Sequence, residues 1–231
     1  MRWARSARGV RPAALRRPDP RSAGAPGLDL AILAGGRGRR LGGVTKPLLR
    51  GADGSTLLER LLRALGPLAD QVWVVAPADL LAPLASSLGP GSGVIGRSPP
   101  RWLPDPGEGP GWGLLAAARA SRAPRLLACA ADLVAPSPRL ARRLLDAAPA
   151  PRSVWVVGRD PEPLFSVVDR AALLRAGAVD PPRAAHRLLA RTAPRALAPE
   201  VLLPEERAGL EDVDDEPALA RAGLTRPRAT G

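Results

Sequence analysis

The chain has 231 residues and a formal net charge of +12, with 45% hydrophobic and 24% charged residues. This length corresponds to one sizeable domain or at most two small ones, and the composition is ordinary for a globular protein. No apolar run reaches the roughly 18 residues of a membrane-spanning helix. A single cysteine and a single histidine exclude an internal disulfide framework, a multi-cysteine zinc site and a histidine-rich metal site.

The positive charge is concentrated at the two ends of the chain. Residues 1–27 contain seven arginines and one aspartate, and residues 220–231 contain three arginines, so the 192 residues between them carry only +3. Aromatic residues, on which single-stranded bases stack, make up 3% of the chain. These features disfavour nucleic acid as the main partner. Residues 1–27 are predicted to be a disordered arginine- and proline-rich extension, although a start codon assigned too far upstream explains them equally well.

From Leu28 onward, short apolar runs alternate with helical patterns. Leu28–Leu33 predicts a buried strand that runs into Ala34-Gly35-Gly36. Thr56 and Glu59 form a capping-box pattern ahead of a leucine-rich helix face over 57–65. Further strands are predicted at 72–75, 126–130, 154–157 and 164–168, with a weak strand at 201–203 and a short one near Val94-Ile95 in a glycine- and proline-rich loop over 89–110. Further helices are predicted at 80–88, 114–120, 138–147 with Ser137 as its cap, 170–176, 182–191 and 215–222.

This alternation predicts an α/β fold with a single Rossmann-like domain, a mostly parallel sheet flanked by helices. The domain is expected to span residues 28–224, followed by a flexible tail over 225–231. Ligands of such sheets bind at the carboxyl ends of the strands. Three features are expected there: the loop after Leu33, Asp132 after the strand at 126–130, and Asp105 in the long loop.

The loop from Leu33 to Leu49 is rich in glycine and basic residues. Its glycines allow tight turns, and their amides can face phosphate oxygens as an anion nest. The loop is neither a Walker loop nor a Gly-x-Gly-x-x-Gly fingerprint, and a flexible basic linker is the alternative. Its basic side chains are Arg37, Arg39, Arg40 and Lys46, and Lys46 is the only lysine among the 34 basic residues of the chain. That lysine is either a chance survivor or a position where the broad arginine fork does not fit.

Carboxylates follow in two places. Asp132 ends an apolar strand, so its charge must be hydrated, paired or metal-bound, and Mg²⁺ held by one or two carboxylates and by substrate phosphates suits it. A helix cap or an exposed turn is the alternative. The run from Glu211 to Glu216 contains five acidic residues. It is typical of a solvated surface or a helix start, and it offers a second carboxylate to a metal.

The run Leu-Ala-Gly-Gly-(x)₃-Arg-Leu-Gly-Gly-Val-x-Lys-x-Leu-Leu over 33–49 resembles the signature loop of the MobA-like NTP transferase family, which has a glycosyltransferase-A-like fold. The similarity extends over 28–224 and is strongest to the molybdenum cofactor guanylyltransferases. It continues in Asp105 with Gly109–Leu114, in Glu162–Phe165 and in Asp212–Asp215. The resemblance implies a cytoplasmic enzyme that transfers GMP from GTP to molybdopterin bearing molybdenum, with Mg²⁺ as cofactor and release of pyrophosphate.

Carried over residue by residue, the resemblance assigns the following roles. The backbone of Leu33, Ala34, Gly35 and Gly36 contacts the nucleotide, Asp105 contacts its nucleoside part, and Lys46 and Arg40 contact phosphates. Asp132 holds Mg²⁺, with Asp214 as the second ligand, and Lys46, Asp132 and Arg40 are the catalytic residues. The sequence departs from the family pattern at Thr45, at Trp112 and at Asp215-Glu216-Pro217.

The chemistry of the residues agrees with this reaction class. A phosphate that attacks an α-phosphorus needs positioning and charge neutralisation, not a protein nucleophile. Accordingly, Cys129 is predicted to lie in the core, and His186 has no assigned role. Alternatives are cytidylyl transfer to molybdopterin, guanylyl transfer to phospholactate, and a catalytically silent nucleotide-binding homologue acting with molybdoenzyme maturation partners.

Overall fold

The computed structural model describes residues 27–36, 38–88, 98–148, 152–157 and 161–227. Its centre is a seven-stranded sheet with the order β3-β2-β1-β4-β6-β5-β7. Within these residues β6 alone runs against the other strands, so the sheet is mostly parallel, as predicted. The strands are β1 (Leu28–Leu33), β2 (Gln71–Ala76), β3 (Arg101–Pro104), β4 (Arg125–Ala130), β5 (Val154–Val157), β6 (Pro161–Asp169) and β7 (Arg195–Leu197).

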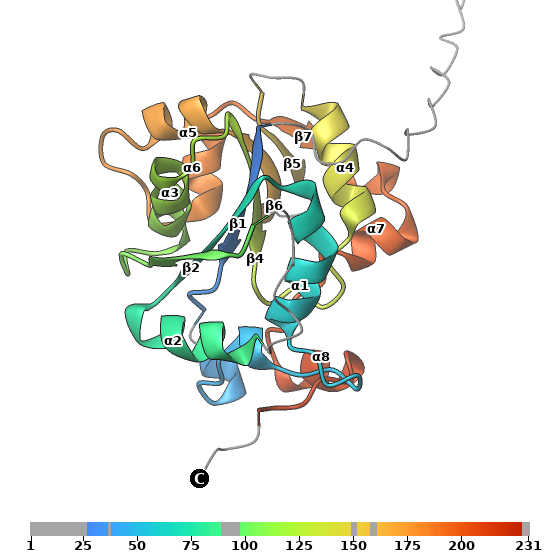
Figure 1. The fold of residues 1–231 in the computed structure, drawn as a ribbon. Helices are drawn as coiled ribbons and strands as arrows, with labels where there is room; N and C mark the ends of the chain where they lie inside the picture. The colour runs from blue at the N-terminus through green and yellow to red at the C-terminus, as the bar shows by residue number, and fades with distance from the viewer. Residues whose placement is uncertain (1–26, 37, 89–97, 149–151, 158–160, 228–231) are drawn as a thin grey trace, which may run out of the picture.

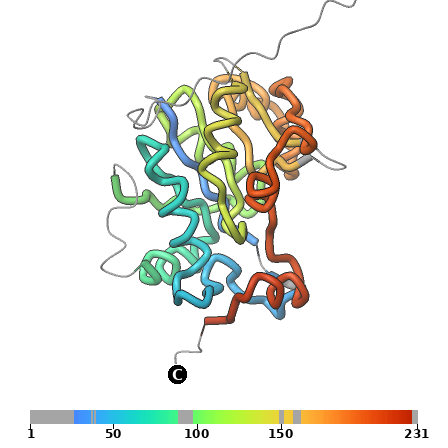
Figure 2. The backbone as a smooth tube through the Cα atoms, turned by 90° about the vertical axis from the view of Figure 1, so that its right-hand side faces the viewer, coloured from blue at the N-terminus to red at the C-terminus, as the bar shows by residue number. Residues whose placement is uncertain are grey.

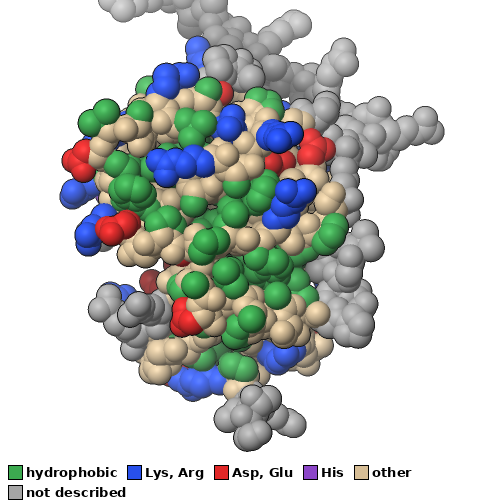
Figure 3. Space-filling view, turned by 60° about the vertical axis from the view of Figure 1, so that its left-hand side comes forward, with side chains coloured by type: hydrophobic (Ala, Val, Ile, Leu, Met, Phe, Trp, Pro, Cys, Tyr) green, Lys and Arg blue, Asp and Glu red, His purple; other side chains and the backbone are tan. Residues whose placement is uncertain are grey.

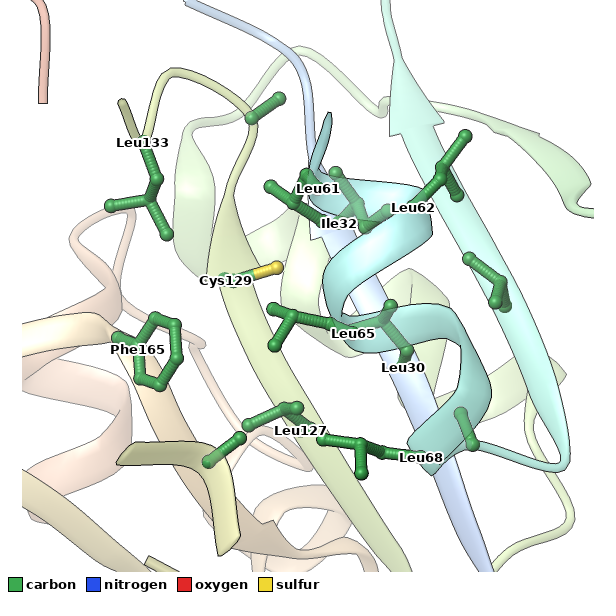
Figure 4. Close-up of a cluster of buried hydrophobic side chains, with 14 of the residues drawn as sticks. Leu30, Ile32, Leu61, Leu62, Leu65, Leu68, Leu127, Cys129, Leu133 and Phe165 are labelled. Atoms are coloured by element: carbon green, nitrogen blue, oxygen red, sulfur yellow. The ribbon is translucent and has the colours of Figure 1, made fainter. Parts of the chain in front are cut away.

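Helices cover both faces of the sheet (Figure 1). One face packs against α3, α5 and α6, which contribute leucines such as Leu114, Leu173 and Leu188 to the core. The other face packs against α1 and α4, and Figure 4 shows Leu61 and Leu65 of α1 above Leu30 and Ile32 of β1. The helices are α1 (Leu57–Leu65), α2 (Ala78–Ser87), α3 (Pro110–Ala120), α4 (Pro138–Ala147), α5 (Arg170–Ala176), α6 (Ala185–Ala190), α7 (Pro204–Ala208) and α8 (Glu216–Arg221).

Local sequence signals set several helix ends. The Thr56 hydroxyl accepts from the Glu59 amide, and the Glu59 carboxylate accepts from the Thr56 amide, which is the predicted capping box at the start of α1. Ser137 caps α4 by a single bond, in which its hydroxyl accepts from the Leu140 amide at 3.2 Å. None of the helices in the described residues is long and apolar enough to cross a membrane.

A third, small apolar cluster joins two distant parts of the chain. It consists of Leu41, Leu49, Leu57, Val213, Leu219 and Leu224, all buried. Arg50 and Thr225 exchange two backbone hydrogen bonds beside it, of 2.9 and 2.8 Å. The segment from 211 to 225 is therefore held against the loop that follows β1, and Figure 2 shows the two segments side by side at the lower end of the molecule.

The structure corrects three of the predicted elements. The predicted strand over 201–203 is wrong: Pro199–Val201 forms a 3-10 turn that opens with proline, and the edge strand is β7, which pairs with β5. The loop over 89–110 contains an unpredicted strand, β3, whose end at Pro104 suits a sheet edge. Helix α3 begins at Pro110, earlier than predicted. Gly111 and Gly113 have low helix propensity, so the sequence pattern did not indicate its first turn.

Three predictions lie outside the described residues in whole or in part. The short strand near Val94-Ile95 falls entirely outside them. So does the predicted extension over 1–27, apart from Gly27. Of the predicted tail over 225–231, only residues 225–227 are described, and Thr225 pairs with Arg50.

Candidate nucleotide-binding site

A cleft opens at the carboxyl ends of β1 and β4, where the strand order reverses direction. From β1 the chain adds β2 and β3 on one side, and then crosses through α3 to β4 on the other. Open α/β sheets bind ligands at such a switch point. The cleft has a volume of about 370 Å³, and the indentation at the left margin of Figure 3 contains recessed acidic atoms. Its lining includes Leu33, Ala34, Gly35, Gly36, Lys46, Asp105, Asp132 and Leu164.

The start of the glycine-rich loop forms one wall of the cleft. The Ala34 amide donates to the Val75 carbonyl at 2.7 Å, which extends the β1–β2 pairing past the end of β1. A Cβ at Gly35 would lie 2.5 Å from Asp105 Oδ2, whereas a Cβ at Gly36 would meet nothing within 4 Å. Gly35 is thus required for the close approach of the Asp105 carboxylate, and Gly36 leaves open space for a ligand.

Asp105 is held by its own backbone and by the loop ahead of α3. Its amide donates to the Ala76 carbonyl at 2.7 Å, and its Oδ1 accepts from the Gly107 amide at 2.9 Å. These bonds fix the carboxylate at the cleft wall, on the same side as Gly35. The structure therefore brings the predicted nucleoside-contacting aspartate to the predicted nucleotide loop.

The first turn of α3 closes the same side of the cleft. Gly109 has a φ of 101°, and a Cβ there would lie 2.9 Å from the Arg183 carbonyl oxygen. The Gly111 amide donates to that carbonyl at 2.8 Å. Trp112, the bulky departure from the family pattern, is half-buried and is not part of the cleft lining. The cleft wall here is made by Gly109, Pro110 and Gly113 instead.

The middle of the glycine-rich loop is a tight turn, and residues 38–43 are not part of the cleft lining. Gly38, Gly42 and Gly43 all have positive φ, and the Leu41 and Gly43 amides donate to the Gly38 carbonyl at 2.8 and 3.0 Å. Leu41 enters the third apolar cluster. Arg40 is exposed and lies outside the cleft lining, and Arg37 lies outside the described residues.

Lys46 brings the loop and two carboxylates together. Its ammonium donates to Asp132 Oδ2 at 2.9 Å and to Asp214 Oδ1 at 2.6 Å. The side chain of Lys46 is 10% exposed, that of Asp132 19% and that of Asp214 54%. Burial alone would lower the pKa of Lys46, but the two carboxylates outweigh it and raise this pKa above its usual value. Lys46 therefore stays charged at neutral pH.

Asp212 is a third carboxylate that sequence reasoning did not single out. Carboxylate oxygens of Asp132, Asp212 and Asp214 all lie within 4.8 Å of one another. Partial burial, together with the charges of Asp132 and Asp214, raises the pKa of Asp212. The sequence feature that could have indicated Asp212 is its spacing from Asp214, with the buried Val213 between them. In an extended segment, side chains two residues apart point to the same side.

The backbone around Val213 explains how these acids reach Asp132. Val213 is fully buried in the third cluster, against residues of the glycine-rich loop. On the other side, Leu133 and Asp212 form an antiparallel bridge, and the Val134 amide donates to the Glu211 carbonyl at 2.9 Å. The acidic segment is therefore fixed to both loops that build the cleft. Asp215 caps α8 by accepting from the Ala218 amide at 2.8 Å, so this departure still begins a helix.

The group of three carboxylates suits a hard divalent cation. Carboxylate oxygens are the ligands that Mg²⁺ prefers, and it uses one or two of them together with phosphate oxygens. Elsewhere in the molecule, Cys129 is fully buried, and burial and the nearby charge of Asp132 raise the pKa of its thiol. His186 is exposed on α6. The burial of Cys129 is as the sequence predicts.

Comparisons with known proteins identify the family of the chain. The model of the MobA-like NTP transferase domain matches residues 30–201. The chain is 36% identical over 181 residues to the molybdenum cofactor guanylyltransferase of Burkholderia orbicola, which covers 69% of this chain and 80% of that relative. It is 35% identical over 151 residues to a probable molybdenum cofactor guanylyltransferase of Methanosarcina acetivorans, across 62% of this chain and 64% of the relative, a little under two thirds of its length.

A solved structure shares the fold over nearly its whole length. Molybdopterin-guanine dinucleotide biosynthesis protein A from Archaeoglobus fulgidus superimposes with a TM-score of 0.67 at 22% identity. The match covers 84% of this chain and 96% of that one.

Proposed function

Because the chain belongs to the MobA-like NTP transferase family, we propose that it transfers GMP from GTP to a molybdopterin-type acceptor and releases pyrophosphate. The relative from Burkholderia orbicola, 36% identical, carries the name of that activity. The structural observation that carries the proposal is the meeting of Lys46, Asp132 and Asp214 at a glycine-walled cleft. A cation and two carboxylates at a cleft of about 370 Å³ suit a reaction that moves a nucleotidyl group.

In this proposal the nucleotide lies along the loop that follows β1. The backbone of Leu33, Ala34 and Gly35 lines its path, and the open space at Gly36 admits phosphate oxygens. Asp105, fixed by the Gly107 amide, accepts a hydrogen bond from the nucleoside part. A contact between Arg40 and phosphate remains a proposal that the cleft does not itself support, since this exposed side chain is not part of the lining.

Asp132 and Asp214 would hold Mg²⁺, with Asp212 close enough to add a third oxygen. A bound Mg²⁺ would supply charge neutralisation on the phosphate oxygens. The half-buried position of Asp132 and its two acidic neighbours fit that role, because three carboxylates so close together favour a cation between them.

The transfer itself needs no nucleophile from the protein. A phosphate oxygen of the acceptor attacks the α-phosphorus of GTP, the bond from that phosphorus to the bridging oxygen of the β-phosphate breaks, and pyrophosphate leaves with the electron pair. Lys46 supplies positive charge to the phosphates as they rearrange. The absence of a reactive cysteine or histidine in the cleft lining agrees with this step.

The experiment is a nucleotide panel followed by turnover. The melting temperature of the purified chain is measured with GTP, CTP, ATP and UTP, each with Mg²⁺, since a ligand of the native state stabilises it. GTP is expected to give the largest rise, and pyrophosphate release is then measured with molybdopterin as the acceptor. A larger rise with CTP would reassign the base, and no rise with any nucleotide would contradict the whole proposal. GTP binding without pyrophosphate release would indicate a catalytically silent homologue.

A further inference from the structure

The ammonium of Lys46 occupies the position in the carboxylate cluster that a cation would take. It lies 2.9 Å from Asp132 Oδ2 and 2.6 Å from Asp214 Oδ1, the same two residues proposed to hold the metal. Both contacts have the short lengths of charge-assisted hydrogen bonds. Two of the oxygens that would coordinate Mg²⁺ are therefore already used by a cation that belongs to the chain.

The position between Asp132 and Asp214 suits one cation and not two, because both cations would use the same oxygens. Asp132, Asp212 and Asp214 carry three negative charges when ionised, and Lys46 supplies one positive charge. An ammonium and a divalent ion that share two carboxylate oxygens at these distances would repel each other strongly in a partly buried site. Binding of the divalent ion between Asp132 and Asp214 therefore requires the ammonium to leave.

The structure gives the ammonium a second place to go. Lys46 also lines the cleft, as do Gly35 and Gly36, where the phosphates are proposed to lie. A lysine carries its charge on a flexible four-carbon stem, whereas the planar fork of arginine is held by paired bonds and needs more space. This physical difference accounts for a lone lysine in a chain whose other basic residues are arginines.

We propose that Lys46 is an internal competitor of the divalent metal: in the nucleotide-free chain it occupies Asp132 and Asp214, and the triphosphate draws it away so that the metal can bind. This inference rests on the proposed function for the identity of the two ligands. Metal and nucleotide then bind with positive coupling, and the coupling is reciprocal by thermodynamic necessity. The free chain is expected to bind metal weakly, and the loaded chain tightly.

The test measures Mn²⁺ binding to the full chain, by the electron paramagnetic resonance signal of free Mn²⁺, in the absence of nucleotide. Lys46→Met removes the ammonium and keeps a chain of similar length. It is expected to bind Mn²⁺ at least about tenfold more tightly than the wild type, because the cation that competes for the two ligands through charge-assisted contacts is gone. Lys46→Gln serves as a second variant, and circular dichroism establishes that each is folded.

Two control variants separate exchange from a general change of charge. Arg122→Met removes a positive charge from an exposed residue that precedes β4, at the opposite end of that strand from Asp132, and should leave Mn²⁺ affinity unchanged. Adding Asp132→Asn to Lys46→Met should abolish the gain. Unchanged or weaker Mn²⁺ binding by both folded Lys46 variants would overturn the proposal.

The coupling is tested with an αβ-methylene analogue of GTP, which lacks the oxygen bridge that breaks. In the wild type the analogue should tighten Mn²⁺ binding by at least about tenfold more than it does in Lys46→Met. If the analogue and Mn²⁺ bind the wild type but Lys46→Met binds Mn²⁺ no more tightly than the wild type, the competition between Lys46 and the metal is wrong and the proposed function stands. If no nucleotide promotes Mn²⁺ binding to the wild type, the proposed function fails as well.

Discussion

Asp29 and Asp132 are two aspartates at opposite ends of the neighbouring strands β1 and β4, and their surroundings differ. Asp29 is 4% exposed and accepts three hydrogen bonds, from Trp73 Nε1 at 2.9 Å, Ser121 Oγ at 2.6 Å and the Gln71 amide at 3.2 Å. Asp132 faces the cleft, and its side chain accepts a 2.9 Å hydrogen bond from the ammonium of Lys46.

The hydrogen-bond partners of the two aspartates distinguish a structural carboxylate from one that is available to a ligand. The Asp29 carboxylate accepts hydrogen bonds from three neutral donors of the protein itself, so its charge is satisfied within the fold. It therefore stabilises the amino end of the sheet. Asp132 lies beside two like charges and shares the ammonium of Lys46 with one of them. A carboxylate that has only a displaceable partner, at the end of the sheet where ligands bind, is the one expected to hold a metal.

The largest expected effect is on turnover, from Asp132→Asn. This change keeps the shape of the side chain but removes its charge, so pyrophosphate release should fall by about 100-fold or more, as when one stabilising group of a transition state is removed. The melting temperature of the ligand-free protein should hardly change, because two acidic neighbours lose a like charge while Lys46 loses a partner. Steady-state pyrophosphate assays and thermal melts measure the two quantities. Full turnover in the variant would remove Asp132 from the site.

Asp29→Ala should show the opposite pattern. The Trp73 and Ser121 donors lose their shared acceptor in a buried place, at a cost of about 1–3 kcal/mol in the free energy of unfolding. For a chain of this size the melting temperature should drop by roughly 3–10 °C. Turnover per folded molecule, assayed well below the melting temperature, should match the wild type. A variant that melts normally but loses turnover would show that the comparison between the two aspartates is misconceived.

Much of this comparison was available from the sequence, for reasons that are local. The apolar runs of β1 and β4, the capping box at Thr56 and the tight turn of the glycine-rich loop each depend on neighbouring residues. The structure confirms these strands, this capping box and this turn. Placing Asp132 at a strand end followed from the run before it. The fold class then placed the loop and this aspartate at one edge of the sheet.

What the sequence could not supply depends on contacts between distant segments. β3 and β7 are short edge strands whose only evidence is their pairing with β2 and β5. Asp212 joins the cluster because Val213 is buried against Leu41 and Leu49, more than 160 residues earlier in the chain. The contact of Lys46 with both Asp132 and Asp214 likewise requires the C-terminal segment to lie across the loop. No periodicity carries such information.

A smaller effect is expected at the wall of the cleft, where two adjacent glycines form a matched pair. Gly35→Ala places a methyl group about 2.5 Å from Asp105 Oδ2, so that carboxylate must move. GTP affinity should fall by about tenfold, the equivalent of one lost hydrogen bond to a charged group. Gly36→Ala meets no protein atom within 4 Å and should weaken binding less. Isothermal calorimetry with GTP and Mg²⁺ measures both, and equal losses would show that Asp105 does not contact the nucleotide.

The smallest expected effect is on the stability of the ligand-free protein, from Asp212→Asn. Partial burial and the charges of Asp132 and Asp214 raise the pKa of Asp212 from its ordinary 3.8, so the ionised group opposes folding at neutral pH. Removing that charge should raise stability at pH 7 by less than about 1 kcal/mol, the range for partly exposed charges screened by solvent.

The sign of this effect can be checked by its dependence on pH. A carboxyl whose pKa is higher in the folded than in the unfolded protein favours folding while it is protonated, and this advantage is lost as the pH rises through the folded value. The wild type and Asp212→Asn should therefore have nearly equal stability below pH 3.8 and diverge above it, with the variant the more stable. Urea denaturation at a series of pH values, without divalent metal, gives the difference directly. A variant that is less stable than the wild type at pH 7 would mean that a favourable partner holds the Asp212 carboxylate. Asp212 would then be a structural carboxylate like Asp29.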